Sequence, residues 1–376
     1  MSKMIDSIRR AIPPLTLLLI VCMAATAQVT ASQIEPIFAK FTSTREPGCA
    51  VLVIKDGKAV FRKGYGVTDL RSLHAIGPDT NFRLASLTKQ FTATAIMLLA
   101  HDGKLRYDDH LSDVLPDFPA YGKAITIRHL LNHTSGLIDY EDIMEKQHPG
   151  VPDEKIPQIK DAEVLELMKL QTGTKFAPGT RWEYSNSGYV VLAMVVEKRS
   201  GMGFGDFLHA RIFKPLEMNE TIAYEKGKNE VANRAYGHTR NAGGWGETDQ
   251  SSTSATLGDG GVYTSLDDLE KWDRALTGNT LLSANEMAAA LTPPATASGR
   301  LQKPAGSVAP FYGFGWFLDP YRGHRRYSHY GETVGFRTAI QRFPDDHLTV
   351  IVLANRAEAD SPALAEQVAD LYVGKP

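Results

Sequence analysis

The feature that most constrains the fold is the order of strand-like and helix-like patterns along the chain. Residues 49–55 and 58–66 are apolar, β-branched runs joined by Asp56-Gly57, which predicts a β-hairpin. Patterns that indicate strands return in the C-terminal third, at residues 312–318, 325–329, 335–343 and 347–354. The section between has mostly helical spacing, at residues 125–131, 162–170, 187–199 and 204–213. Residues 240–261, rich in Gly, Ser, Thr and Asp, are expected to form a loop.

This order predicts an α+β fold in which the N- and C-terminal segments build one antiparallel sheet. Helices flank the sheet, and a closing helix is expected from about Asp360. We expect one domain over residues 28–376, with its sheet part in residues 28–100 and 255–376. Residues 101–254 form a mainly helical insert, and a functional site is expected in the crevice between the two parts.

The first 27 residues have the pattern of a secretory signal peptide. Basic residues come first, then an apolar core at residues 15–25, then Ala25-Thr26-Ala27 as a cleavage site. The apolar core is short for a membrane span, although an uncleaved anchor stays an alternative. Periplasmic or secreted localisation is therefore expected, without stable membrane insertion after cleavage. Cleavage removes Cys22 and leaves Cys49, which lies in a strand pattern and is expected to be buried.

Composition excludes several classes of function. The 376 residues carry a formal net charge of −2, which indicates neither a nucleic acid nor an anionic membrane surface as partner. The chain has no phosphate-loop pattern, no zinc-type spacing and no cysteine cluster. We therefore expect no cofactor and no metal.

A serine and a lysine spaced for one helical face stand at the start of an apolar helix. In Ser86-Leu87-Thr88-Lys89 the two side chains are three positions apart, and residues 91–100 are apolar nearly all round. A serine hydroxyl needs a base, and a lysine buried at a positive helix N-terminus has its charged form disfavoured. Free N–H groups of the first turn can stabilise an oxyanion. The four-residue pattern alone is weak evidence, because its usual interpretation is a capping serine with a solvated lysine.

Two later motifs add candidate site residues. Tyr184-Ser185-Asn186 precedes an apolar helix, so its phenol can relay a proton and its amide can hold both Lys89 and a substrate carbonyl. His329-Tyr330-Gly331 ends a strand pattern. There Gly331 is expected to let a substrate approach the strand edge, and the backbone N–H of Glu332 is a second oxyanion donor. His133 is interpreted as structural, because no Gly-x-Ser-x-Gly elbow accompanies it.

Taken together, these motifs resemble those of the serine β-lactamase and penicillin-binding protein superfamily. The similarity is to its class C-like branch of β-lactamases, D-alanyl-D-alanine carboxypeptidases and esterases. Further stretches also look like this branch: residues 130–137, 176–179, 260–263 and 312–316. The resemblance spans nearly the whole chain after residue 27, and it implies a β-lactamase/transpeptidase-like fold.

The resemblance also implies roles for the matching residues. Ser86 is the acylated nucleophile, and Lys89 and Tyr184 share general base and acid work. Asn186 orients the substrate amide, and the N–H groups of Ser86 and Glu332 form the oxyanion hole.

His329 stands where many β-lactamases have a lysine that attracts the substrate carboxylate, which lowers the expectation of an efficient β-lactamase. The protonation of His329 stays open at this point. The expected function is an exported serine hydrolase acting on a D-amino-acid peptide or a small ester. A weak β-lactamase and a non-catalytic penicillin-binding sensor or scaffold are the alternatives.

Overall fold

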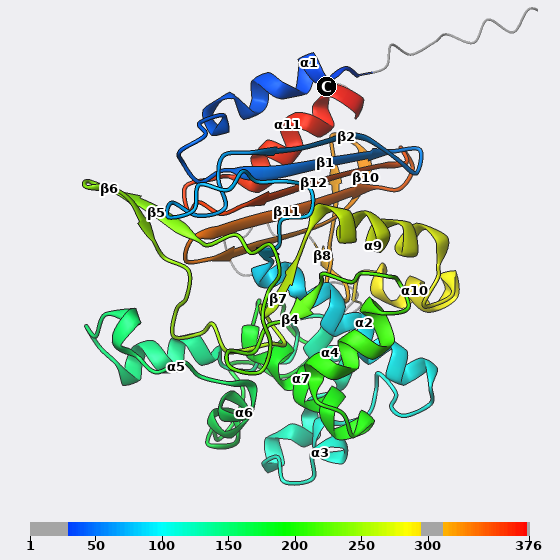
Figure 1. Ribbon diagram of the computed structural model, residues 1–376. Helices are drawn as coiled ribbons and strands as arrows, with labels where there is room; N and C mark the ends of the chain where they lie inside the picture. The colour runs from blue at the N-terminus through cyan, green and yellow to red at the C-terminus, as the bar shows by residue number, and fades with distance from the viewer. Residues whose placement is uncertain (1–28, 295–310, 374–376) are drawn as a thin grey trace, which may run out of the picture.

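The computed structural model describes residues 29–294 and 311–373, so the proposed signal peptide lies outside the described residues. A seven-stranded antiparallel sheet forms the upper part of the molecule in Figure 1, and most of the helices lie below it. Its strand order is β2-β1-β12-β11-β10-β9-β8. The strands come from the two ends of the chain: β1 (Cys49–Lys55), β2 (Lys58–Tyr65), β8 (Phe311–Tyr312), β9 (Phe317–Tyr321), β10 (His324–Thr333), β11 (Phe336–Phe343) and β12 (Leu348–Ala354). The predicted fold class is confirmed.

The sheet is joined where the N-terminal hairpin meets the last strand. β1 pairs with β2 through the predicted Asp56-Gly57 turn, and on its other side it pairs with β12 in the register Cys49↔Ala354 to Lys55↔Leu348. Both strands are buried on both faces, which explains their nearly continuous apolar sequence. Cys49 is fully buried, as expected for a structural cysteine.

Each face of the sheet is covered by its own apolar cluster. The outer face packs against η1 (Glu35–Phe41), which follows α1 (Ala31–Ile34), and against α11 (Ser361–Val373). Alternate residues of β1 belong to different clusters. Val51 and Val53 pack in the outer cluster with η1 and α11, and Ala50 and Leu52 pack in the inner cluster on the opposite face of the sheet. This alternation follows from the two-residue period of a strand.

The inner face carries the helical part of the molecule. Its central element is α2 (Lys89–His101), buried at every position from Lys89 to Leu99, as the sequence pattern predicts. The chain's other described helical segments on this side of the sheet are α3 (Leu111–Val114), η3 (Ala120–Ala124), α4 (Ile127–Leu131), α5 (Tyr140–Gln147), η4 (Asp153–Lys155), α6 (Asp161–Lys169), α7 (Asn186–Ser200), α8 (Phe204–Leu208), the π-helical turn η5 (His209–Phe213), α9 (Leu266–Gly278) and α10 (Ala284–Ala290).

Two expectations for strands and loops are wrong. The strand expected at residues 312–318 is instead the hairpin of β8 and β9, because the N–H of Gly313 donates to the carbonyl oxygen of Trp316 at 2.8 Å and Gly315 adopts φ of 77° in the turn between them. The loop expected at residues 240–261 begins with a projecting hairpin of β5 (His238–Asn241) and β6 (Gly244–Glu247). Thr239 is the one β-branched residue in these two strands, so the segment carries little of the sequence signal that usually indicates strands.

A small three-stranded sheet lies between the two parts. It consists of β3 (Phe82–Arg83), β7 (Val262–Thr264) and β4 (Ile222–Ala223) in the order β3-β7-β4. β3 ends immediately before η2 (Ala85–Thr88), which leads directly into α2. The small sheet therefore fixes the direction from which the chain enters the nucleophile turn.

Candidate active site

Ser86 lies in a turn that the backbone holds in an unusual conformation. Ala85 has φ of 50°, a left-handed conformation that non-glycine residues rarely adopt. Just before it, the N–H of Leu84 donates to the carbonyl oxygen of Val262 at 2.8 Å. Such backbone strain persists only where the surrounding structure enforces it, and it concentrates at functional sites.

Lys89 makes three polar contacts that define the state of its amine. Its Nζ lies 3.1 Å from Oγ of Ser86, 2.8 Å from Oδ1 of Asn186 and 2.9 Å from the carbonyl oxygen of Asp259. The ammonium form donates to all three oxygens. After it loses a proton, the amine keeps its two hydrogens on the carbonyl-type oxygens, which can only accept, and its lone pair is directed at the Ser86 hydroxyl. Complete burial of Lys89 lowers its pKa from 10.5 to about 8.

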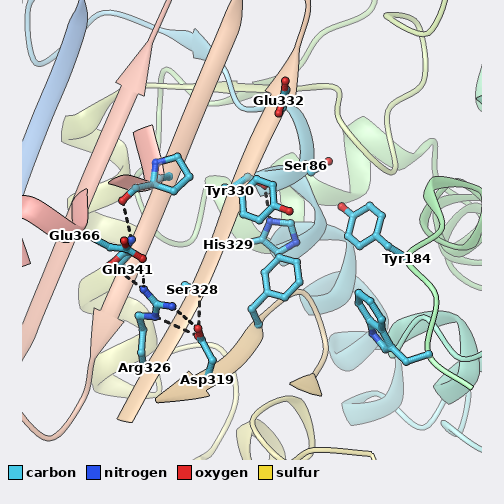
Figure 2. A pocket seen from close by; sticks show the side chains of 14 residues that line it. Ser86, Tyr184, Asp319, Arg326, Ser328, His329, Tyr330, Glu332, Gln341 and Glu366 are labelled. Carbon is cyan, nitrogen blue, oxygen red and sulfur yellow. Dashed lines mark hydrogen bonds and ion pairs between the residues drawn. The ribbon is translucent and has the colours of Figure 1, made fainter. Parts of the chain in front are cut away.

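Tyr184 lies on the loop before α7, and its hydroxyl points toward Ser86 (Figure 2). The phenol faces the Ser86 hydroxyl, and Nζ of Lys89 lies 5.0 Å from the ring centroid. Burial among aromatic side chains nevertheless raises the Tyr184 pKa well above 10. The phenol is therefore neutral at physiological pH.

Asn186 connects the lysine to an acidic rim. Its Oδ1 accepts from Lys89, and its Nδ2 donates to Oε1 of Glu141 at 3.2 Å. Its backbone N–H, at the first residue of α7, donates to Oδ2 of Asp139 at 2.7 Å. The amide is thus oriented from both ends, which fixes the lysine contact.

The far end of β10 provides the free edge of the sheet. β9 pairs only with residues 324–328 of β10, so within the described residues its last part, from His329 on, has β11 as its single neighbour. Thr333 and Phe336 close the two-residue hairpin as a hydrogen-bonded pair, so the N–H of Glu332 points away from β11. That N–H is directed to the open edge, as an oxyanion donor requires. The side chain of Glu332 pairs with Arg337 at 3.0 Å.

Gly331 allows the strand and the nucleophile turn to pack closely. A Cβ at this position would lie 2.0 Å from the carbonyl oxygen of Leu84 and 2.4 Å from Oγ1 of Thr338. The missing side chain therefore allows β10 to approach the turn before Ser86. Substrate approach to the strand edge at Gly331 stays a prediction.

His329 is buried and neutral. Its Nδ1 lies 2.7 Å from the carbonyl oxygen of Tyr330, which can only accept, so the proton is on Nδ1. Nε2 then accepts from the Tyr312 hydroxyl at 2.8 Å. Burial, and next the charge of Lys89, lower the His329 pKa to about 3. The position of the usual lysine therefore carries no charge in this protein.

His133 contributes to the packing of the site. Its ring lies 4.2 Å from that of Tyr184 and 4.4 Å from that of Tyr312, centroid to centroid. Its Nδ1 accepts from the backbone N–H of Ser185 at 3.2 Å. No role in a Ser-His-Asp triad follows from this geometry, because Lys89 occupies the place of the base.

A cleft of ≈ 340 Å³ opens beside Ser86 along the β10 edge. Trp182, Phe317 and Tyr330 form an aromatic wall, with Phe317 and Tyr330 stacked at 5.5 Å. Of the described residues that line the cleft, the one cation is Arg326, which is already paired with Asp319 and Glu366. No group of His, Cys, Asp and Glu among the described residues is arranged to hold a metal ion.

The fold and the site define the class of protein as a serine hydrolase with a Ser–Lys pair. The Beta-lactamase family model matches residues 31–373, so the chain belongs to this family and the resemblance seen in the motifs is confirmed. Penicillin-binding protein 4* of Bacillus subtilis is 35% identical over 321 residues, which cover 82% of this chain and 68% of that protein. A D-aminopeptidase of Brucella canis is 30% identical over 82% of this chain and 56% of its own length.

Solved structures agree on the fold. An octameric penicillin-binding protein homologue from Pyrococcus abyssi has a TM-score of 0.77 at 26% identity, over 92% of this chain and 76% of that chain. A D-amino acid amidase from Ochrobactrum anthropi has a TM-score of 0.73 at 22% identity, over 90% of this chain and 98% of its own.

Several contributors to the site could not be found from the sequence. The Asp259 carbonyl that orients Lys89 and the Tyr312 hydroxyl that fixes His329 are separated from the motifs in sequence. Neither lies in a local pattern with a chemical signature. Tertiary structure alone brings them to the motif residues.

Proposed function

We propose that the protein hydrolyses an amide or ester through an acyl-enzyme on Ser86. The observation that carries this proposal is the set of three Lys89 contacts, which directs a neutral amine at the serine hydroxyl. Oγ of Ser86 attacks the substrate carbonyl carbon while its proton passes to Nζ of Lys89. The negative oxygen that forms accepts from the N–H groups of Ser86 and Glu332.

Proton delivery to the leaving group falls to Tyr184. Its raised pKa keeps the hydroxyl protonated, and its orientation toward Ser86 places it on the side of the bond that breaks. The phenol gives its proton to the leaving nitrogen or oxygen, and the resulting phenolate takes a proton back from the neighbouring Lys89 ammonium. Water then attacks the acyl-enzyme by the reverse sequence, and the free Ser86 hydroxyl is restored.

The charge at the cleft supports a substrate whose leaving group carries no carboxylate. His329 is neutral, and Arg326 is already paired with two carboxylates. When a carboxylate on the leaving group enters the cleft it loses hydration, and a buried neutral imidazole does not compensate for that loss. An amide or ester of a D-amino acid, as the names of two relatives suggest, suits this cleft better than a free D-Ala-D-Ala terminus.

A comparison of matched substrates tests both statements. We expect Ser86→Ala to abolish hydrolysis of p-nitrophenyl acetate and labelling by a fluorophosphonate, with circular dichroism showing an unchanged fold. We also expect N-acetyl-D-Ala-D-Ala amide to be cleaved at least as fast as the free acid. Undiminished turnover by the serine variant would contradict the mechanism, and a clear preference for the acid would contradict the substrate assignment.

An aminopeptidase-type activity is the second candidate, favoured by the position of Glu141. Its carboxylate lies on the Asn186 side of the nucleophile, and partial burial and the neighbouring carboxylates raise its pKa to about 7. An anion there suits the free ammonium of a D-amino acid amide. Faster cleavage of D-alanine p-nitroanilide than of its N-acetyl form, lost in Glu141→Gln, would support this candidate.

The alternatives from the sequence remain distinguishable by experiment. Turnover of nitrocefin would support a weak β-lactamase, while stoichiometric labelling by a fluorescent penicillin without turnover would support a sensor. We also propose that residues 1–27 direct export. N-terminal sequencing of the mature protein from its native host should then begin at Gln28. None of the described helices is both long and apolar enough to cross a membrane.

A further inference from the structure

The backbone that orients Lys89 belongs to the short segment Leu257–Asp259, and this segment is held in place by side chains from two helices. The carbonyl oxygen of Asp259 accepts from Lys89 at 2.9 Å. One residue earlier, the carbonyl oxygen of Gly258 accepts from Oγ1 of Thr92 on α2 at 2.6 Å. A rigid segment here gives the lysine a fixed acceptor.

The second clamp on this segment is a carboxylate from the helical insert. Asp161, the first residue of α6, is 8% exposed. Its Oδ2 accepts from the N–H of Leu257 at 2.7 Å, and its Oδ1 accepts from the N–H of Gly258 at 2.9 Å. Both oxygens are therefore used by consecutive backbone donors, which an amide side chain cannot reproduce because it has one acceptor atom.

The segment has little room to move in the remaining direction. A Cβ on Gly258 would lie 2.5 Å from the carbonyl oxygen of Tyr189 and 2.7 Å from Cβ of Ala193, so the backbone is packed directly on α7. Asp161, Thr92 and α7 thus hold the segment from different sides. A change in any of them is transmitted to the Asp259 carbonyl, one residue away.

Ionising the buried Asp161 carboxyl costs free energy, which its two backbone hydrogen bonds must offset. Burial raises the pKa of this carboxyl to about 7, although the two N–H donors oppose the shift. A group with a raised pKa stabilises the folded state at low pH and loses that contribution as pH rises through about 7. At the pH where Lys89 is neutral, the Asp161 anion therefore holds the loop at the expense of stability.

We propose that Asp161 is a positioning residue that acts through Leu257–Asp259 on the amine of Lys89. The inference deepens the proposed acyl-transfer function and rests on it. Without the carboxylate, the Asp259 carbonyl moves from its position and one hydrogen of the amine loses its acceptor. The lone pair is then no longer held toward Ser86, and small misplacements of a reacting group lower rates severely.

Loss of the Asp161 carboxylate is also expected to lower the pKa of Lys89. The charged groups that face its amine are Asp259, Glu141 and Asp139, which favour the ammonium, while His133 and His329 are buried and neutral. Asp161 does not contact the lysine itself. Displacing the Asp259 carbonyl and carboxylate removes support for the ammonium, so the lysine pKa falls.

Asp161→Asn in the full-length protein, with p-nitrophenyl acetate as substrate, tests the proposal. We expect kcat to fall about 10- to 100-fold with KM changed little, and the acidic limb of the pH profile to move to lower pH. Asp153→Asn is the matched control, because Asp153 accepts from the N–H of Ser252 at 3.1 Å in the same loop without reaching Lys89. This control should keep the kcat and pH profile of the unchanged protein.

Two outcomes distinguish a failure of this inference from a failure of the proposed function. If the unchanged protein shows no Ser86-dependent hydrolysis, the proposed function fails. If it is active and Asp161→Asn keeps its kcat and pH profile, the inference alone is overturned. Should Asp161→Asn not fold, Thr92→Val removes the other clamp with little change in shape, and the same loss of kcat is expected. A Thr92→Val protein with full activity would also overturn the inference.

Discussion

At the scale of the residue, environment decides what a motif position can do. His329 occupies the place of a cationic residue in many relatives of the family, yet two hydrogen bonds and full burial keep it neutral. Lys89 is buried equally well, but carboxylates of Asp259, Glu141 and Asp139 keep its pKa near 8 rather than lower. One site thus holds a neutral imidazole and an amine that titrates close to neutral pH.

The first prediction at this scale concerns pH. Below its pKa of about 8, Lys89 is an ammonium and cannot take the Ser86 proton; above it, the amine is free. We therefore expect kcat/KM for p-nitrophenyl acetate to rise with pH and level off above about pH 8. A stopped assay from pH 6 to 10 measures this. Lys89→Arg, which stays charged throughout, should be inactive at every pH. A flat profile over this range would exclude Lys89 as the base.

At the scale of the element, the sequence was most informative where one pattern decides one structure. The hairpin at β1 and β2, the buried helix α2 and the last two strands lie where their apolar patterns predict them. The prediction of one strand at residues 312–318 failed because a turn divides it. Gly313 and Gly315 permit that turn, so the apolar pattern folds back on itself as the hairpin β8–β9.

The site shows the same division. Ser86, Lys89, Tyr184 and Asn186 were all found from short motifs, and the structure brings them together. Asp161 was not found, because an aspartate at a helix start has a sufficient local explanation as a residue favoured by the helix dipole. Its two backbone partners lie almost a hundred residues later in the chain.

The contact between β10 and η2 makes a prediction about Gly331. A methyl group there has no space beside the Leu84 carbonyl and the Thr338 hydroxyl, so Gly331→Ala must separate the oxyanion strand from the nucleophile turn. We expect kcat/KM to fall about 100-fold and the melting temperature to drop. Gly173→Ala, at a position with open space, is the control. Equal kinetics for both variants would show that the strand contact is not needed.

At the scale of the whole molecule, one buried amide joins segments from distant parts of the chain. Oδ1 of Asn355 accepts from the N–H of Gly48 at 2.8 Å, and Nδ2 donates to the carbonyl oxygens of Val67, Thr68 and Tyr236 at 3.0–3.2 Å. The residue is fully buried immediately after β12. It therefore ties the start of β1 and the ends of β2 and β12 to the segment that leads into the β5–β6 hairpin.

We expect Asn355→Ala to lower the free energy of unfolding by about 3 kcal/mol, because it leaves several buried backbone groups without partners. Urea unfolding followed by fluorescence measures the change. Gln367→Ala removes an exposed amide whose contact lies within its own helix, and it should have almost no effect. A loss for Asn355→Ala no larger than for this control would show that the junction does not depend on the amide.

The pairing of β1 with β12 also determines at what stage of its synthesis this protein can become active. Ser86 is synthesised well before the strand that supplies the second oxyanion donor and before β12, the partner of β1. Pairings so distant in sequence form slowly. A nascent polypeptide therefore carries a serine that cannot yet react, and hydrolytic activity requires that β1 and β12 have paired.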